Sequence, residues 1–165
     1  MAIKKTIAIV GATGELGRAI VNKFAFTPYR LLLVSPKINE LDKLTAFLNQ
    51  QAPVAEIEPV ECVKDSCWEA DIITTAVAPS EEKEVAELMK EVATQKIVVV
   101  VSENENECKE LEKVLPYSKI VKAFINKETN EVSLNGKSET VNEEISSIFI
   151  QAGYRTALKT VNSKF

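Results

Sequence analysis

Three glycines near the N-terminus have a spacing suited to nucleotide binding. Gly11, Gly14 and Gly17 form a G-x-x-G-x-x-G pattern and make up three of the five glycines in the chain. Such glycines permit a tight turn, a close approach of backbone to a ligand, and close packing of a helix on a strand. The N-terminus of that helix would then bind a pyrophosphate. The candidate pyrophosphate-binding residues are Gly11, Ala12, Thr13, Gly14, Glu15 and Leu16.

The pattern departs from the commoner G-x-G-x-x-G spacing, and glycine spacing alone is a weak signal. Its context strengthens the interpretation, because a β-branched run at 7–10 precedes it and Leu16, Ile20 and Phe24 follow at helical spacing. The alternative is a strand-to-helix turn that binds nothing. We therefore predict a dinucleotide-binding domain and keep that alternative open.

The residues that follow the second expected strand bear on the choice of cofactor. A dinucleotide-binding fold that selects NAD usually places Asp or Glu there, to accept hydrogen bonds from the ribose 2′-OH. This chain has Ser35, Pro36 and Lys37 instead. A hydroxyl and a cation are suited to a 2′-phosphate, so NADP is favoured over NAD. Alternatively, Ser35 caps the next helix and Lys37 is solvated.

A third candidate segment follows the strand expected at 72–77. The carboxyl ends of parallel strands meet at the ligand crevice of such folds. Ala76, Val77 and Ala78 are small enough to leave room for a nicotinamide ring. We therefore add these three residues to the candidate cofactor site and assign no catalytic residue.

The pattern of apolar residues defines the elements that must position these segments. Strands are expected at 7–10, 29–34, 54–62, 72–77, 96–101, 118–124, 132–134 and 155–161, with helices between most of them. Pro59 places the third strand at a sheet edge, and the strongly hydrophobic run at 97–101 indicates a central strand. We predict an α/β fold of three layers, a Rossmann-type doubly wound, mostly parallel sheet with helices on both faces. It is expected to form one NAD(P)-binding domain over residues 1–165.

Two features resemble functional sites but have ordinary structural explanations. The acidic segment 102–107 is predicted to be a loop and a helix start, followed by a buried stripe of Cys108, Leu111 and Leu115. Trp68 is predicted to pack over the connection at 65–71 and not to stack on a ligand.

Composition excludes several other classes of function. The chain has no histidine, and Cys62, Cys67 and Cys108 lack C-x-x-C spacing, which argues against a zinc site or a disulfide framework. A formal charge of -4 and a pI near 5.1 give no attraction to nucleic acid or anionic membrane. Because we find neither a signal peptide nor an apolar run long enough to span a bilayer, we expect a cytoplasmic protein.

Several motifs together resemble a known family. They are Gly11 to Gly17, Ala70 to Pro79, Leu115-Pro116 followed by Ile120 to Phe124, and an Asn135-Gly136 turn leading to Ala152-Gly153-Tyr154. In this order, and over most of the chain, they resemble the predicted dinucleotide-binding proteins related to coenzyme F420-dependent NADP oxidoreductase. The resemblance implies a Rossmann domain that binds NADP. In the fully active members it also implies hydride transfer between NADP and a deazaflavin.

The chain departs from that family at three places. Pro36 stands where members usually carry an arginine for the 2′-phosphate, so only Lys37 could compensate. The Asn-Pro motif common after the fifth strand is replaced by Ser102-Glu-Asn-Glu. The sequence stops near the last strand, where relatives continue into segments that build the substrate pocket and dimer contacts. A partner subunit could supply that pocket, so we expect a homodimer with a small-molecule substrate or hydride acceptor.

The Gly11-Ala-Thr-Gly14 opening is also similar to atypical short-chain dehydrogenase-like proteins and their NADP-sensing relatives. Active members would show Tyr-x-x-x-Lys, in which the lysine lowers the pKa of the tyrosine. Here Tyr29, Tyr117 and Tyr154 are followed four positions later by Leu33, Val121 and Leu158. Two functions remain: hydride transfer between NADP(H) and an unknown acceptor, such as a flavin or deazaflavin, or a non-catalytic NAD(P)-binding sensor or interaction module.

Overall fold

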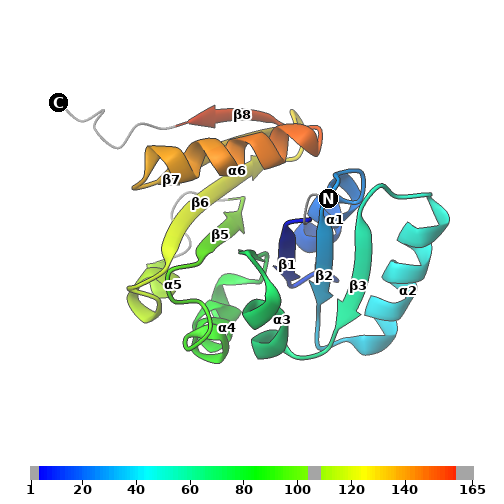
Figure 1. The fold of residues 1–165 in the computed structure, drawn as a ribbon, viewed down its shortest axis with the longest axis horizontal. Helices are drawn as coiled ribbons and strands as arrows, with labels where there is room; N and C mark the ends of the chain where they lie inside the picture. Colours follow the sequence, from blue (N-terminus) through cyan, green and yellow to red (C-terminus); the bar gives the residue numbers. More distant parts are fainter. Residues whose placement is uncertain (1–3, 104–108, 159–165) are drawn as a thin grey trace.

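The computed structural model describes residues 4–103 and 109–158, which form alternating strands and helices (Figure 1). The elements in the first part are β1 (Thr6–Val10), α1 (Glu15–Phe24), β2 (Arg30–Val34), α2 (Ile38–Gln50), β3 (Glu56–Val60), α3 (Val63–Glu69), β4 (Ile72–Thr75), the 3-10 turn η1 (Pro79–Glu81), α4 (Glu82–Met89) and β5 (Ile97–Ser102). Then follow α5 (Lys109–Val114), β6 (Lys119–Asn126), β7 (Glu131–Gly136), α6 (Glu139–Gln151) and β8 (Arg155–Leu158). Each predicted strand is present within a few residues of its expected bounds.

The described strands form one eight-stranded sheet in the order β3-β2-β1-β4-β5-β6-β7-β8. All pairings are parallel except β6 with β7, which form an antiparallel hairpin. The order reverses between β1 and β4, so the connections that follow these two strands run in opposite directions, and this switch point is where such sheets bind ligands. The predicted doubly wound α/β fold is confirmed, with β3 at an edge and β5 near the centre.

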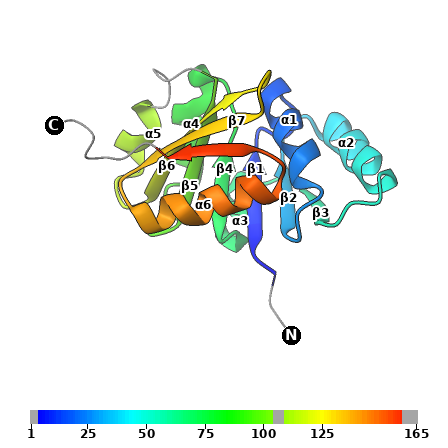
Figure 2. The same cartoon turned by 90° about the horizontal axis from the view of Figure 1, so that it is seen from above.

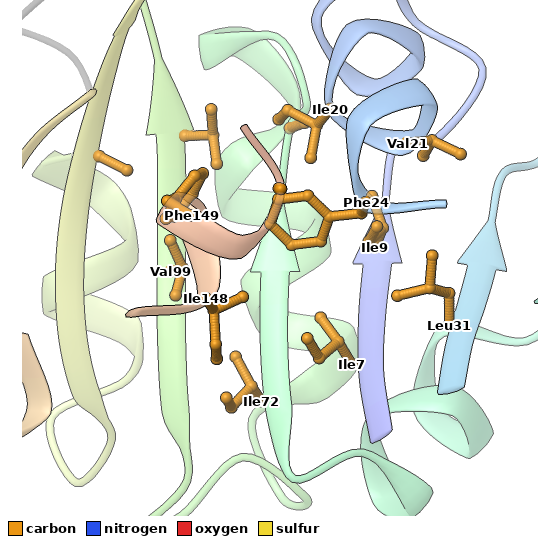
Figure 3. Packing of buried hydrophobic residues seen from close by; sticks show 14 of the residues in the cluster. Ile7, Ile9, Ile20, Val21, Phe24, Leu31, Ile72, Val99, Ile148 and Phe149 are labelled. Carbon is orange, nitrogen blue, oxygen red and sulfur yellow. The ribbon is translucent and has the colours of Figure 1, made fainter. Parts of the chain in front are cut away.

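Side chains alternate between the two faces of the sheet because successive strand residues point to opposite sides. Ile7 and Ile9 of β1 face a core that α1, α2 and α6 cover, and Ala8 and Val10 face a second core under α3, α4 and α5. Figure 3 shows the first core. Phe24 of α1 and Phe149 of α6 meet there edge to face, with ring centroids 5.4 Å apart.

The helix α6 contributes Val141, Ile145, Ile148 and Phe149 to this core. It runs alongside β8, drawn in red in Figure 2, and covers the same face as α1. Phe149 also packs edge to face on Tyr154, which precedes β8, at 5.5 Å. The last helix and strand therefore belong to the same packed body as β1 and α1, the elements that carry the glycine motif.

The prediction for Trp68 is wrong. Trp68 is 71% exposed, whereas its neighbour Cys67 is completely buried. The short α3 buries Ser66 and Cys67, and the side chain of Trp68, a further 100° around the helix, points away from that buried face. The indole instead lies beside Lys96, whose ammonium is 5.9 Å from the ring centroid and donates to the carbonyls of Cys67 and Trp68.

The structure also corrects a turn assignment. Asn135 and Gly136 lie inside β7, where Gly136 is opposite Val121, and do not form a turn. The reversal occurs at the turn predicted for 127–130, where Asn130 has a left-handed φ of 58°. Of the expected stripe near 108–115, Leu111 and Leu115 are buried as predicted, while Cys108 and most of the acidic segment lie outside the described residues.

Within the described part of the chain, no helix has the length and apolar character needed to cross a bilayer. Over the same residues, no three Cys, Asp or Glu side chains gather as metal ligands would.

Candidate functional site

The glycine loop between β1 and α1 is fixed by contacts of its own backbone. Gly11 has a φ of +89°, and a Cβ atom there would lie 2.7 Å from the carbonyl oxygen of Ala76. A Cβ on Gly17 would lie only 1.9 Å from the carbonyl oxygen of Gly11. Both positions therefore require glycine, one for the turn and one for the close packing of α1 on the loop. The turn at Gly11 is as the sequence predicts, whereas Gly17, predicted to pack the helix on its strand, packs it on the loop that follows this strand.

Gly14 differs from these two glycines. It has an extended conformation, with φ -72° and ψ 169°, which any residue can adopt. A Cβ there would meet only the carbonyl oxygens of Gly11 at 3.5 Å and Ala76 at 4.0 Å, which are ordinary contacts. No described part of the protein therefore requires glycine at this position. A missing side chain at the start of α1 leaves a hollow where a ligand can approach the backbone.

A pocket of about 520 Å³ opens beside this hollow, at the carboxyl ends of β1, β2 and β4. Its volume is in the range of small-molecule sites. The predicted residues that line it are Gly11, Thr13, Gly14, Ser35, Lys37, Ala76 and Val77. The sequence therefore identified residues from three strand ends that the fold brings to one cavity.

Four other predicted residues do not line the pocket. Ala12 is completely buried in the core, and Leu16 packs against that core. The side chain of Glu15 is 87% exposed and turns toward Lys127, while Ala78 lies exposed beyond the pocket wall. The contribution of Ala12, Glu15 and Leu16 to a ligand site would thus come from their backbone.

The far wall of the pocket consists of residues that were not expected from the sequence. This wall consists of Glu61, Cys62, Val63 and Lys64 after β3, and of Glu81, Glu84, Val85 and Leu88 on η1 and α4. Residues 61–64 could have been predicted, because they follow β3 and the carboxyl ends of all parallel strands lie at the same edge of a doubly wound sheet.

Ser35 connects the end of β2 to the glycine loop. It is only 2% exposed, its hydroxyl lies 2.5 Å from the hydroxyl of Thr13, and it accepts a hydrogen bond from the Lys37 N–H at 3.1 Å. The N–H groups of Gly11 and Ala12 also donate to the carbonyl of Val34, at 2.9 and 3.1 Å. These bonds fix the distance between the two sides of the pocket, and they direct the backbone of Lys37.

Charged side chains surround the end of β2. The side chain of Lys37 is 70% exposed, and its ammonium lies 3.6 Å from one carboxylate oxygen of Glu40. The Arg18 guanidinium lies 3.5 Å from the other Glu40 oxygen and donates from Nε to the carbonyl of Thr13 at 2.8 Å. Neither Arg18 nor Glu40 was singled out from the sequence.

An ion cluster joins the glycine loop to the β6–β7 hairpin. The Lys127 ammonium lies 2.8 Å from a carboxylate oxygen of Glu15 and 3.2 Å from one of Glu103. The hydrogen bond that the Lys127 ammonium donates to Glu15 lowers the pKa of Glu15, and its hydrogen bonds to the Glu15 and Glu103 carboxylates raise the pKa of Lys127. Lys127 is 112 residues from Glu15 along the chain, so no local pattern could have indicated this pair.

Comparison with known proteins gives a family for most of this region. Residues 6–113 match the family model described as NADP oxidoreductase, coenzyme F420-dependent. The matched segment contains the glycine loop, the end of β2 and the end of β4. No curated protein sequence matches the chain.

Solved structures share the fold at low sequence identity. A pyrroline-5-carboxylate reductase from Coxiella burnetii superposes with a TM-score of 0.75 at 18% identity, over 98% of this chain and 60% of that one. A Plasmodium falciparum pyrroline carboxylate reductase with NADP bound gives 0.70 at 16% identity, over 97% and 59%. A protein from Arthrobacter sp. FB24 assigned as an F420-dependent NADP reductase gives 0.72 at 14%, over 92% and 82%. The chain thus spans about 60% of the length of the two pyrroline carboxylate reductases.

Proposed function

The chain belongs to the coenzyme F420-dependent NADP oxidoreductase family, and from this premise we propose that it binds NADP(H) in the glycine-loop pocket. We further propose that it serves as an oxidoreductase domain, transferring a hydride between NADP(H) and a small-molecule acceptor of the flavin or deazaflavin type. NAD is the less favoured cofactor.

The observation that carries the proposal is the hollow at Gly14 in the wall of the 520 Å³ pocket. Gly11 and Gly17 are glycines because the protein itself leaves no room for a side chain. At Gly14 the protein has room for a side chain. A ligand phosphate bound at the start of α1 would explain why this position is nevertheless a glycine. The residues present therefore fit a dinucleotide.

Different residues would hold the different parts of the cofactor. The backbone from Gly11 to Leu16 would bind the pyrophosphate, with the N-terminal end of α1 favouring its charge. Lys37 would bind the 2′-phosphate, with Ser35 holding the backbone in place. Ala76, Val77 and Ala78 would border the nicotinamide. When bound, the cofactor supplies the hydride, so the protein needs to orient two rings and exclude water more than it needs a side-chain acid or base.

Exclusion of water bears on the assembly of the protein. Ala78, which follows the pocket-lining Val77, is exposed to solvent, so another surface must cover the acceptor during hydride transfer. We infer that a second copy of the chain provides this cover, in a homodimer of single-domain subunits working in the cytoplasm.

The test is calorimetric titration of the purified protein with NADPH and with NADH at one fixed ionic strength. We expect NADPH to bind at least tenfold more tightly, because a 2′-phosphate contact to a cation is a charge-assisted hydrogen bond. Absence of binding by either nucleotide would refute the proposal.

A second measurement separates the enzyme from the non-catalytic sensor that resembles short-chain dehydrogenase-like proteins. NADPH oxidation would be followed with flavins and with a deazaflavin as acceptor. Turnover with one of them supports the oxidoreductase, whereas tight NADPH binding without turnover for any acceptor favours the sensor.

A further inference from the structure

We propose that Arg18 and Lys37 together form the subsite for the 2′-phosphate, and that Glu40 occupies this subsite until NADPH displaces it. Glu40 would then set how strongly the domain prefers NADPH over NADH. This inference rests on the proposed NADP(H) binding and adds to it two residues, Arg18 and Glu40, that the glycine and Ser-Pro-Lys motifs do not contain.

The first argument is geometric. One carboxylate contacts both cations, through a different oxygen for each: Arg18 at 3.5 Å and Lys37 at 3.6 Å. Guanidinium and ammonium groups that fit the two oxygens of a carboxylate also fit two oxygens of a phosphate, because the two anions present similar spacings. Whatever anion replaces the Glu40 carboxylate therefore finds both cations within reach.

The second argument concerns the position of the three side chains. Arg18 is anchored to the glycine loop by the bond from its Nε to the carbonyl of Thr13, and Thr13 and Lys37 both line the pocket. The subsite therefore lies where the glycine loop meets the end of β2. Arg18 approaches it from α1, so it supplies the guanidinium that Pro36 cannot provide from the β2 side.

The third argument is that the carboxylate can leave. About 41% of the Arg18 side chain, 45% of that of Glu40 and 70% of that of Lys37 is exposed, so the contacts are solvated and individually weak. A 2′-phosphate carries close to two negative charges at neutral pH, about twice the charge of a carboxylate. It therefore competes successfully for the two cations, but it has to release Glu40 from them first.

The consequence is that Glu40 weakens NADPH binding. Its carboxylate competes with the 2′-phosphate and repels it, while a ligand without that phosphate leaves the three side chains as they are. Removing the charge of Glu40 should therefore strengthen binding only of ligands that carry the phosphate.

The experiment compares 2′,5′-ADP with 5′-ADP, and NADPH with NADH, by calorimetry on the full chain. For Glu40→Gln we expect about a threefold to tenfold gain in affinity for 2′,5′-ADP and NADPH, and less than about a twofold change for 5′-ADP and NADH. Arg18→Met should weaken the two phosphorylated ligands, and in the double variant the gain from Glu40→Gln should shrink. Asp42→Asn is the matched control, because it removes the same charge from an exposed position of α2 and should leave all four affinities unchanged.

The outcomes separate this inference from the proposed function. If wild type prefers NADPH but Glu40→Gln binds it no better than wild type and Asp42→Asn, NADP binding stands and the role of Glu40 is refuted. If Arg18→Met keeps full affinity for 2′,5′-ADP, the role of Arg18 is refuted. If wild type binds none of the four ligands, the proposed function fails and this inference fails with it. Thermal unfolding of each variant verifies that it is folded.

Discussion

The two sides of the pocket are held in place by different kinds of interaction. At the glycine loop, Gly11 and Gly17 touch the surrounding backbone so closely that a single added carbon would collide with it. At the end of β2, Lys37, Glu40 and Arg18 are held mainly by solvated charges. Close packing does not tolerate added volume and is insensitive to salt. Exposed ion pairs tolerate changes of volume but are weakened by salt.

This difference indicates a division of labour. The closely packed glycine loop would provide a rigid binding site for the pyrophosphate, a group common to all dinucleotides. The charged side would provide discrimination, which can change with one side chain and with ionic strength. The four predictions below test this division, in order of decreasing effect.

The largest effect is expected for Gly17→Ala. Its methyl group would overlap the carbonyl of Gly11, so α1 must move away from the loop. Overpacking of this kind costs about 2–3 kcal/mol of stability. Chemical denaturation would measure the loss, and NADPH affinity should fall as well because this binding site is distorted. An unchanged unfolding midpoint would show that the loop is not held by packing.

Gly14→Asp should separate binding from stability. The new side chain would place volume and negative charge where the pyrophosphate is proposed to lie, so NADPH affinity should fall by about a hundredfold or more. Stability should stay the same or rise by a few tenths of a kcal/mol, because Gly14 is the N-cap of α1 and aspartate is a better N-cap. Calorimetry and thermal unfolding give the two readouts. Equal NADPH affinity in variant and wild type would refute the assigned site.

Lys37→Ala should weaken NADPH by about tenfold and NADH by less than about twofold, because only NADPH has the 2′-phosphate. The NADPH affinity of wild type should also fall faster with added salt than that of the variant. Lys43→Ala on the same helix removes an exposed charge and is the control. Equal losses for NADPH and NADH would mean that Lys37 is simply a solvated lysine.

The smallest effect is expected at the ion pair between Glu15, at the start of α1, and Lys127. The pKa of Glu15 is lowered from 4.5 by its hydrogen bond to Lys127, so the pair contributes stability above that pH and loses it as the carboxylate becomes protonated. Glu15→Gln should cause a small decrease in Tm at pH 7, and the difference from wild type should shrink as the pH falls below 4.5. A large decrease at pH 7 would contradict the view that packing holds the glycine loop.

Much of the fold was predictable because its signals are local. Alternating apolar strands and helices indicated the doubly wound sheet, and Pro59 indicated the edge position of β3. The prediction for Trp68 was wrong because it relied on the hydrophobicity of the side chain. Exposure of Trp68 depends instead on its position on α3, whose buried face carries Ser66 and Cys67. Pocket residues were predictable in two ways. A known motif marks the glycine loop, and the carboxyl ends of parallel strands, which meet at the ligand crevice, carry Ser35, Lys37 and Ala76.

The sequence by itself determined the glycine loop, since turn conformation and close packing depend on a few neighbouring residues. Tertiary structure decided which residues complete the pocket and its charges. The contact of Glu40 with Lys37 is local, because the two residues are three apart at the start of α2. Arg18 reaches Glu40, and Lys127 reaches Glu15, only because the folded chain brings separate elements together. The physical reason is that electrostatic interactions depend on distance in space and not along the chain.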